Sequence, residues 1–206
     1  MFNGNKLKPL CRHWRDRVPI ADKIVLASSL RGVASLDNNP QKSNPPSALA
    51  IPYLSVYLDA EWASAGSVWA NCKGREIVKE LELWRSSNGP AAIIVPWPDY
   101  GVIPPNSFMD LVIMVGSLID EGEVVEVGCV GGHGRTGTLL AAVLGVLENV
   151  DAGEAVAALR SRYCAKAVET EGQAGLLEKI LGGEVYIPPK EEVKWDRYYD
   201  KNFWLG

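Results

Sequence analysis

The feature that most constrains the fold is a helix that is apolar on every side and follows an apolar strand after a short glycine-rich loop. The strand is predicted over residues 124–129 and the helix over residues 136–147. A helix without a polar face lies at the centre of a core, and a nearly continuous apolar strand is typical of a sheet covered on both faces. The segment therefore predicts an α/β domain built around this strand, loop and helix.

Three further apolar, β-branched runs of strand length come earlier in the chain, at residues 23–27, 53–58 and 91–95. Strands of this kind, followed by helices, favour a buried sheet with parallel pairing. We therefore expect a central, mostly parallel sheet of about four to five strands, flanked by helices in a three-layer domain.

The remaining helices carry start and stop signals. Apolar residues recur at spacings of three and four over residues 107–120, and Gly122 is placed to end this helix. The first of two later helices is predicted over residues 151–162, and the second ends at residues 182–183. Capping-box pairs mark their starts: Asp151 with Glu154, and Thr170 with Gln173.

Composition limits the class of protein. The chain has 206 residues, of which 47% are hydrophobic and 22% charged, and its formal net charge is −4. These values exclude a disordered chain or a coiled coil and argue against a protein that binds nucleic acid by neutralising many phosphates. Residues 1–35 nevertheless carry 7 basic and 2 acidic groups. We interpret this basic segment as a solvated surface, with polyanion binding as the alternative.

Cysteine and histidine spacing shows no metal motif. No C-x-x-C pair occurs and the chain has 2 histidines, so we expect no zinc site and reduced thiols. The longest apolar runs are about half of a membrane span, and the N-terminus lacks the apolar stretch of a secretory signal. We therefore expect a cytoplasmic protein without a membrane span. The cysteines and histidines are Cys11, Cys72, Cys129, Cys164, His13 and His133.

Residues 127–138, VGCVGGHGRTGT, carry the chemistry. The glycines let the backbone curl and point successive N–H groups at one centre beside a helix start, which makes a nest for a phosphate-sized dianion. The same dipoles and a nearby guanidinium stabilise a thiolate at Cys129 and make it a nucleophile. Arg135 can bind two phosphate oxygens at once. A nucleotide-binding P-loop is the disfavoured alternative, because the G-x-x-x-x-G-K-[ST] order is absent.

The pattern C-x5-R followed by T-G resembles the phosphate-binding loop of the protein tyrosine phosphatase superfamily. Upstream, residues 97–101, WPDYG, resemble that family's mobile general-acid loop, and Asp99 lies 30 residues before Cys129. Residues 167–173, AVETEGQ, resemble the segment in which family members carry a glutamine that positions the hydrolytic water. The resemblance covers about residues 90–182 and implies a phosphatase-like α/β fold that hydrolyses phosphomonoesters.

The resemblance also implies a role for each matching residue. Cys129 would attack phosphorus, Asp99 would protonate the leaving oxygen and then deprotonate water, and Arg135 would hold the transferring group. Thr136 matches the hydroxyl that stabilises the leaving thiolate, and Gln173 matches the water-positioning glutamine. This route through a cysteinyl-phosphate implies neither a metal nor a cofactor. The expected phosphate-binding residues are Val130, Gly131, Gly132, His133, Gly134 and Arg135.

No segment matches the phosphotyrosine-recognition loop, and the chain is shorter than tyrosine-specific catalytic domains usually are, so its build is closer to the dual-specificity-like or atypical branch. Gly128 stands where the family usually has histidine, so a contact that tunes the thiolate is missing or supplied elsewhere. We expect the phosphatase-like catalytic domain over residues 47–189. A basic N-terminal segment and loop, residues 1–46, packs on it or leads into it, and an aromatic-rich tail, residues 190–206, follows it.

The expected partner is a phosphorylated substrate, with phosphotyrosine or another phosphoprotein first. His133 opens an alternative, because its imidazole either shapes the loop by a hydrogen bond or adds charge that favours a polyanion, such as a phosphoinositide or the 5′ phosphate of RNA. Gly128 opens another, a catalytically weak pseudophosphatase that binds a phosphorylated ligand. Cys72 and Cys164 are expected to be core thiols, with redox pairing to Cys129 as the alternative.

Overall fold

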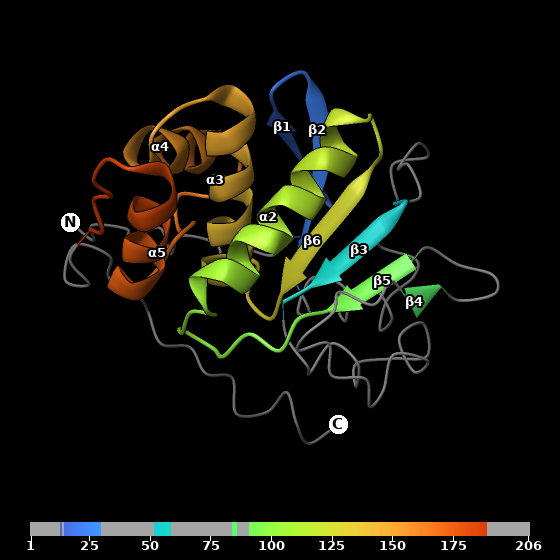
Figure 1. The fold of residues 1–206 in the computed structure, drawn as a ribbon, viewed down its shortest axis with the longest axis horizontal. Coiled ribbons are helices and arrows are strands. Elements are labelled where there is room, and N and C mark those ends of the chain that lie inside the picture. Colours follow the sequence, from blue (N-terminus) through green and yellow to red (C-terminus); the bar gives the residue numbers. More distant parts are fainter. Residues whose placement is uncertain (1–12, 14, 30–51, 59–83, 86–90, 189–206) are drawn as a thin grey trace, which may run out of the picture.

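The structure, a computed structural model, describes residues 13, 15–29, 52–58, 84–85 and 91–188. Its described strands form one six-stranded sheet in the order β1-β2-β6-β3-β5-β4 (Figure 1). The two predicted terminal segments fall largely outside these residues, as do Cys11 and Cys72. The predicted division into a domain and two appendages therefore stays a prediction.

Four parallel strands make the middle of the sheet. They are the four predicted strands, with ends that differ from the prediction by one or two residues, which confirms the α/β class and the mostly parallel sheet. Their bounds are Lys23–Ser29 (β2), Leu54–Tyr57 (β3), Ala91–Ile94 (β5) and Val125–Cys129 (β6).

Two antiparallel strands add the edges that the sequence pattern did not reveal. β1, Asp16–Ile20, pairs with β2 across a tight turn, and β4, Trp84–Arg85, pairs with β5. β1 buries only Val18 and Ile20. It also contains Pro19, which cannot donate to a ladder and is tolerated at a sheet edge. Part of the basic N-terminal segment thus belongs to the sheet.

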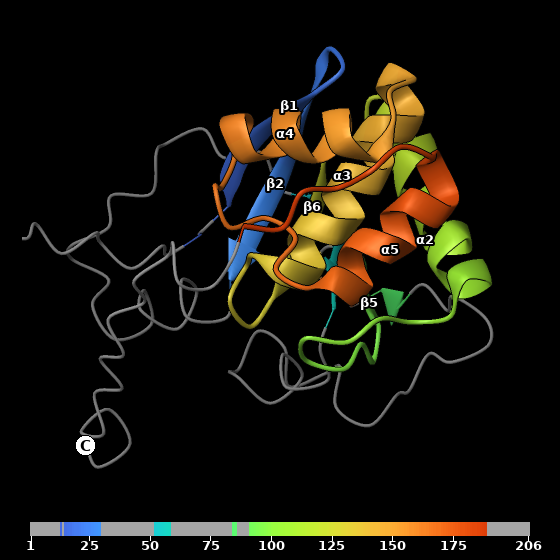
Figure 2. The ribbon, with the colours of Figure 1, turned by 90° about the vertical axis from the view of Figure 1, so that its left-hand side faces the viewer.

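The described helices lie on one face of the sheet (Figures 1 and 2). Among the described residues they form one helical layer, so the second helical layer of the expected three-layer domain stays a prediction. α2 and α3 contact the strands, and α4 and α5 pack on α3. Among the described residues, no helix combines the length and apolarity that crossing a membrane requires. The four helices match the four predicted ones: Pro105–Asp120 (α2), Gly134–Glu148 (α3), Ala152–Arg162 (α4) and Glu171–Leu181 (α5).

α3 is the central helix of the core, as its all-apolar sequence predicts. Every residue from Gly134 to Gly145 is buried, and the helix contacts α2, α4, α5 and β6. It ends at Asn149, whose φ of 54° places it in the left-handed conformation that often closes a helix. The N-terminus of this helix is consequently fixed directly after the predicted phosphate loop.

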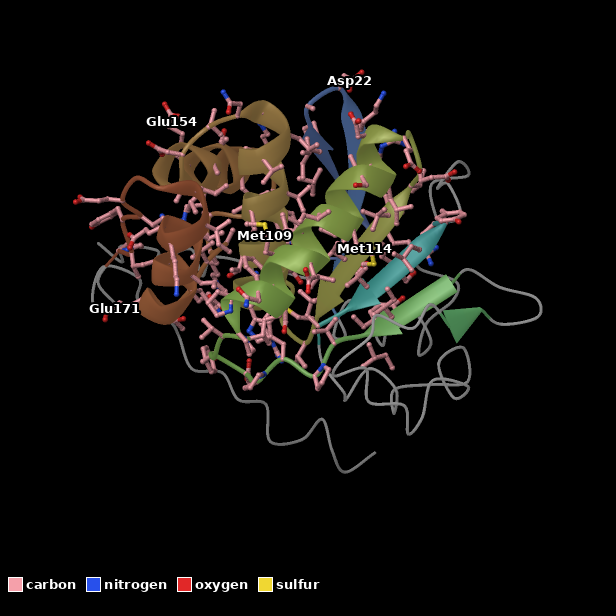
Figure 3. The ribbon with its side chains drawn as sticks, viewed as in Figure 1. Asp22, Met109, Met114, Glu154 and Glu171 are labelled. Carbon is pink, nitrogen blue, oxygen red and sulfur yellow. The ribbon has the colours of Figure 1, made fainter. Side chains whose placement is uncertain are left out.

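The two later helices begin as their capping signals predict. Asp151 accepts a hydrogen bond from the Glu154 N–H at 2.9 Å, and the Glu154 carboxylate accepts one from the Asp151 N–H at 3.4 Å. Glu154 and Glu171 lie in the first turns of α4 and α5 and project outward (Figure 3). Acidic groups there interact favourably with the helix dipole.

Candidate active site

Cys129 is the last residue of β6, at the carboxyl edge of the parallel strands. Ligands of open α/β sheets bind at this edge. The side chain is buried, with 2% of its surface exposed, and its Sγ accepts a hydrogen bond from the Gly132 N–H at 3.2 Å. A backbone N–H of the loop is thus aimed at the sulfur.

The loop after Cys129 needs glycine at one position above all. Gly132 has a φ of +75°, and a Cβ there would lie 3.0 Å from the Ser29 side chain and 3.0 Å from the His13 ring. The Gly132 carbonyl accepts a hydrogen bond from the Tyr163 hydroxyl. The loop then runs into α3, whose first N–H groups and dipole favour an anion.

Arg135 joins the phosphate loop to the predicted acid loop. Its side chain is 3% exposed, and its Nη1 donates to the Trp97 carbonyl at 2.8 Å. Its Nη2 donates to Asp99 Oδ1 at 3.0 Å. The predicted phosphate-binding residue and the predicted general acid, far apart in the sequence, are thus in direct contact.

Trp97 anchors the acid loop. Its indole N–H donates to the Gly101 carbonyl at 2.8 Å, and its ring meets Phe108 of α2 edge to face with centroids 5.5 Å apart. The Trp97 side chain is buried whereas that of Asp99 is 66% exposed. A fixed tryptophan with an exposed carboxylate beside it presents Asp99 at the surface next to Arg135.

Thr136 and Gln173 occupy different environments. The Thr136 hydroxyl is buried and has no hydrogen-bond partner among the described residues, so the structure shows no Thr136 contact to Cys129. Gln173 is 1% exposed, and its Oε1 accepts from the Glu169 N–H at 2.9 Å. Its Nε2 lies 2.9 Å from the place that a Gly134 Cβ would take. Gln173 therefore lies against the phosphate loop.

His133 is half-buried and contacts residues outside the loop. Its Nδ1 lies 3.2 Å from His13 Nε2 and 3.3 Å from Cys164 Sγ. This geometry supports the interpretation in which His133 shapes the loop through hydrogen bonds. Val130 and Gly131, the first residues after the nucleophile, are also half-buried.

Glu169 is the functional candidate that the sequence argument missed. Its carboxylate accepts a hydrogen bond from the Gly134 N–H in the phosphate loop. Burial raises the pKa of Glu169, and the charge of Asp99 raises it further, against the Gly134 hydrogen bond, Lys166 and Arg135, which lower it. A carboxylate with a raised pKa beside a nucleophile is typical of active sites.

The segment that carries Glu169 is held in a strained conformation. Val168 has a φ of +63°, which is unfavourable for a β-branched residue. Arg160 of α4 donates to the carbonyls of Ala167 at 3.1 Å and of Val168 at 3.2 Å. Strain of this kind persists where the surroundings fix it, so α4 positions Glu169 at the loop. The only local signal in the sequence is the first of the two glutamates inside AVETEGQ.

We expect Glu169→Gln to change how stability depends on pH. The pKa of Glu169 is raised above 4.5 in the folded chain, so the folded state binds more protons than the unfolded state from about pH 4.5 up to the raised pKa, and stability falls with rising pH there. The neutral amide in Glu169→Gln removes the contribution of Glu169 to the slope of stability against pH. Urea midpoints across the window measure it, with the exposed Glu171→Gln as the matched control. Parallel slopes in wild type and Glu169→Gln would contradict the assignment.

Two comparisons with known sequences bear on the family. Residues 65–147 match the family described as "Polymorphic toxin system, DSP-PTPase phosphatase". Two uncharacterised proteins of Methanocaldococcus jannaschii are 44% and 42% identical over 90 residues, which is 43% of this chain. The match spans 58% and 54% of their lengths, so the chain spans little more than half of these relatives.

Solved structures share the fold across most of the chain. Tk-PTP in its active form is 19% identical, with a TM-score of 0.55 over 81% of this chain and 97% of that chain. Kinase associated phosphatase, with its catalytic-site cysteine replaced by serine, is 13% identical, with a TM-score of 0.54 over 83% and 96%. PTPMT1 in complex with PI(5)P is 15% identical, with a TM-score of 0.50 over 76% and 88%.

The sequence match and the shared fold agree with the motifs at the carboxyl edge of β6. The family match includes the segment with Cys129 and Arg135, and the described sheet and helices have the arrangement of the solved phosphatases. The described part of the chain therefore has a dual-specificity-like phosphatase fold, and residues 65–147 are similar to a DSP-PTPase phosphatase family.

Proposed function

We propose that the chain is a cysteine-dependent phosphatase that hydrolyses phosphomonoesters through a cysteinyl-phosphate intermediate. The observation that carries the proposal is the contact between Arg135 and Asp99 beside the loop that begins at Cys129. Nucleophile, phosphate-binding fork and acid are then within reach of one substrate phosphate. A location in the cytoplasm is part of the same proposal, since a thiolate nucleophile is preserved in a reducing compartment.

In the first step the Cys129 thiolate attacks phosphorus, and the bond from phosphorus to the leaving oxygen breaks. Asp99 gives its proton to that oxygen. The equatorial phosphate oxygens take hydrogen bonds from the loop N–H groups and from Arg135. The Gly132 N–H, which lies 3.2 Å from Sγ, stabilises the thiolate before attack.

In the second step water attacks the cysteinyl-phosphate, Asp99 takes a proton from this water, and the Cys129 thiolate leaves. Gln173 and Glu169 lie against Gly134, where they can orient the water. The buried Thr136 hydroxyl is available to donate to the leaving thiolate. The N–H groups and Arg135 supply the electrostatic stabilisation, so the route needs no metal ion.

We expect Asp99→Asn to lower kcat by about 10²–10⁴-fold, the usual contribution of a positioned general acid. The loss should be smaller for p-nitrophenyl phosphate than for phenyl phosphate, because nitrophenolate leaves without much protonation. Asp110→Asn, at an exposed position of α2, is the matched control. An equal loss for both leaving groups would mean that another residue is the acid.

The proposed substrate class is a phosphoprotein, with phosphotyrosine first. The same fold occurs in kinase associated phosphatase and in PTPMT1, which was solved in complex with PI(5)P. A polyanionic phosphoester is therefore the alternative substrate class. A matched pair of substrates, a phosphotyrosine peptide and a phosphoinositide, separates the two by kcat/KM.

One assay separates an enzyme from a phosphate-binding pseudophosphatase. Purified protein is incubated with p-nitrophenyl phosphate in the presence of a chelator, and released phosphate is measured. Turnover that persists with the chelator supports the proposed enzyme. Tight vanadate binding without turnover would assign the chain to the binding-only alternative, with Gly128 as the departure that accounts for it.

A further inference from the structure

Three segments that are distant in the sequence meet beside the phosphate loop: the chain at His13 before β1, the loop after β6, and the chain after α4. Each contributes one side chain with a metal-binding atom. His13 Nε2 lies 3.2 Å from His133 Nδ1, and Cys164 Sγ lies 3.3 Å from the same Nδ1. The three atoms all lie within 4.8 Å of one another. Both histidines of the chain are thus used in one cluster.

The hydrogen bond on the far side of His13 prepares it as a ligand. Its Nδ1 lies 2.6 Å from Asp16 Oδ2, and since a carboxylate accepts, Nδ1 carries the proton in the neutral ring. The lone pair is then on Nε2, which faces His133. A carboxylate that fixes the tautomer of a histidine in this way is a recurrent partner of metal-bound imidazoles.

The spacing of the ligand atoms fits a tetrahedral ion. With Zn–N bonds of about 2.05 Å and Zn–S bonds of about 2.3 Å, two nitrogens lie about 3.3 Å apart and a nitrogen and a sulfur about 3.5 Å apart. Two of the three separations, 3.2 and 3.3 Å, are close to these values. The third, from His13 Nε2 to Cys164 Sγ, is within 4.8 Å, so an ion would draw these two side chains closer together.

The donor set and its burial favour a borderline-soft cation. His13 and Cys164 are each 5% exposed, and two imidazoles with one thiolate suit Zn²⁺ better than the oxygen-seeking Mg²⁺ or Ca²⁺. We propose that His13, His133 and Cys164 bind one divalent transition-metal ion, with Zn²⁺ the preferred one. Binding releases the Cys164 thiol proton to solvent, and the proton that His133 Nδ1 donates to His13 Nε2 moves to His133 Nε2, so that both facing nitrogens present lone pairs to the ion.

The ion would restrain the phosphate loop by linking His133 to two ligands outside the loop, His13 and Cys164. His133 belongs to the loop, and Tyr163, next to Cys164, already donates to the Gly132 carbonyl. A metal joins these contacts to the start of β1. The ligand set excludes Cys129, so the site is separate from the proposed nucleophile and does not depend on the proposed phosphatase activity.

The test loads chelator-treated full-length protein with Co²⁺ or Zn²⁺. Wild type is expected to bind one equivalent of Co²⁺ with the near-ultraviolet absorption of a thiolate ligand. Cys164→Ser should lose this band, and His13→Ala should bind at least about 10-fold more weakly. Cys129→Ser and Cys72→Ser are the matched thiol controls and should keep both band and stoichiometry.

A second measurement uses the wild type, so it does not depend on whether a variant of the site folds. X-ray absorption of the zinc-loaded wild type is expected to show one sulfur at about 2.3 Å and nitrogen or oxygen ligands at about 2.0 Å, and zinc should raise the melting temperature. Absence of a stoichiometric thiolate complex in wild type would overturn the proposal. Loss of the band in Cys129→Ser with retention in Cys164→Ser would overturn it too, because the ion would then occupy the nucleophile.

Discussion

Replacing Cys129 by serine is expected to abolish phosphate release, with a loss of more than about 10⁴-fold in kcat. A hydroxyl at this position is a far weaker nucleophile than a thiolate at neutral pH. The phosphate-binding groups stay in place, because the loop N–H groups and Arg135 belong to backbone and side chain that the substitution does not touch. Binding of phosphate or vanadate should therefore remain measurable.

The measurement combines a phosphate-release assay with calorimetric titration of the same Cys129→Ser preparation. Binding in that preparation is also the control for folding, since the anion site requires the loop conformation in which Gly132 has a φ of +75°. Appreciable turnover in Cys129→Ser would contradict the cysteinyl-phosphate route. Loss of both turnover and binding, with an unchanged melting temperature, would mean that the thiolate itself organises the loop.

The parts of the fold that were predictable from the sequence depend on local signals. Apolar runs located the four central strands, and the all-apolar helix located the core. Caps gave helix starts, with one instructive difference: Thr170 accepts from the Gln173 N–H at 3.2 Å, but the Gln173 side chain pairs with the Glu169 N–H rather than with Thr170. Local pattern therefore found the helix start and missed the contact that places Gln173 at the loop.

The parts that were not predictable depend on pairing across the chain. Glu126 lies in an apolar strand, yet it is buried and accepts hydrogen bonds from Ser28 at 2.6 Å and from Ser55 at 3.1 Å, residues of the neighbouring strands. His13 and His133 are 120 residues apart. Spacing rules for zinc motifs search for near neighbours, which is why the sequence argument expected no zinc site and could not find the cluster on which the zinc proposal rests.

The same limit applies to the acid loop. The sequence places Asp99 30 residues before Cys129, but only the fold shows that it contacts Arg135 and that Trp97 supplies a carbonyl to the same guanidinium. The sequence motif predicts which residue types are present. The contact between Arg135 and Asp99 predicts that a substitution at one of them also affects the other. A change at Arg135 is expected to disturb the acid loop as well as phosphate binding.

Arg135→Lys is therefore expected to lower kcat/KM nearly as much as Arg135→Ala, on the order of 10²–10³-fold or more. Two guanidinium nitrogens donate to different acceptors, the Trp97 carbonyl at 2.8 Å and Asp99 at 3.0 Å, and the same fork is needed for two phosphate oxygens. A lysine ammonium keeps the charge and loses the planar fork.

Phosphate release from p-nitrophenyl phosphate measures both Arg135 variants, and Arg17→Lys, at an exposed position of β1, is the matched control. Melting temperatures separate a lost contact from a lost fold, because Arg135 is 3% exposed and an alanine there leaves a cavity. A mild loss in Arg135→Lys beside a severe one in Arg135→Ala would show that charge alone suffices, which removes the bidentate role. A lower melting temperature with an unchanged kcat in the folded fraction would contradict phosphate binding by Arg135. Its role would then be to connect the phosphate loop to the acid loop.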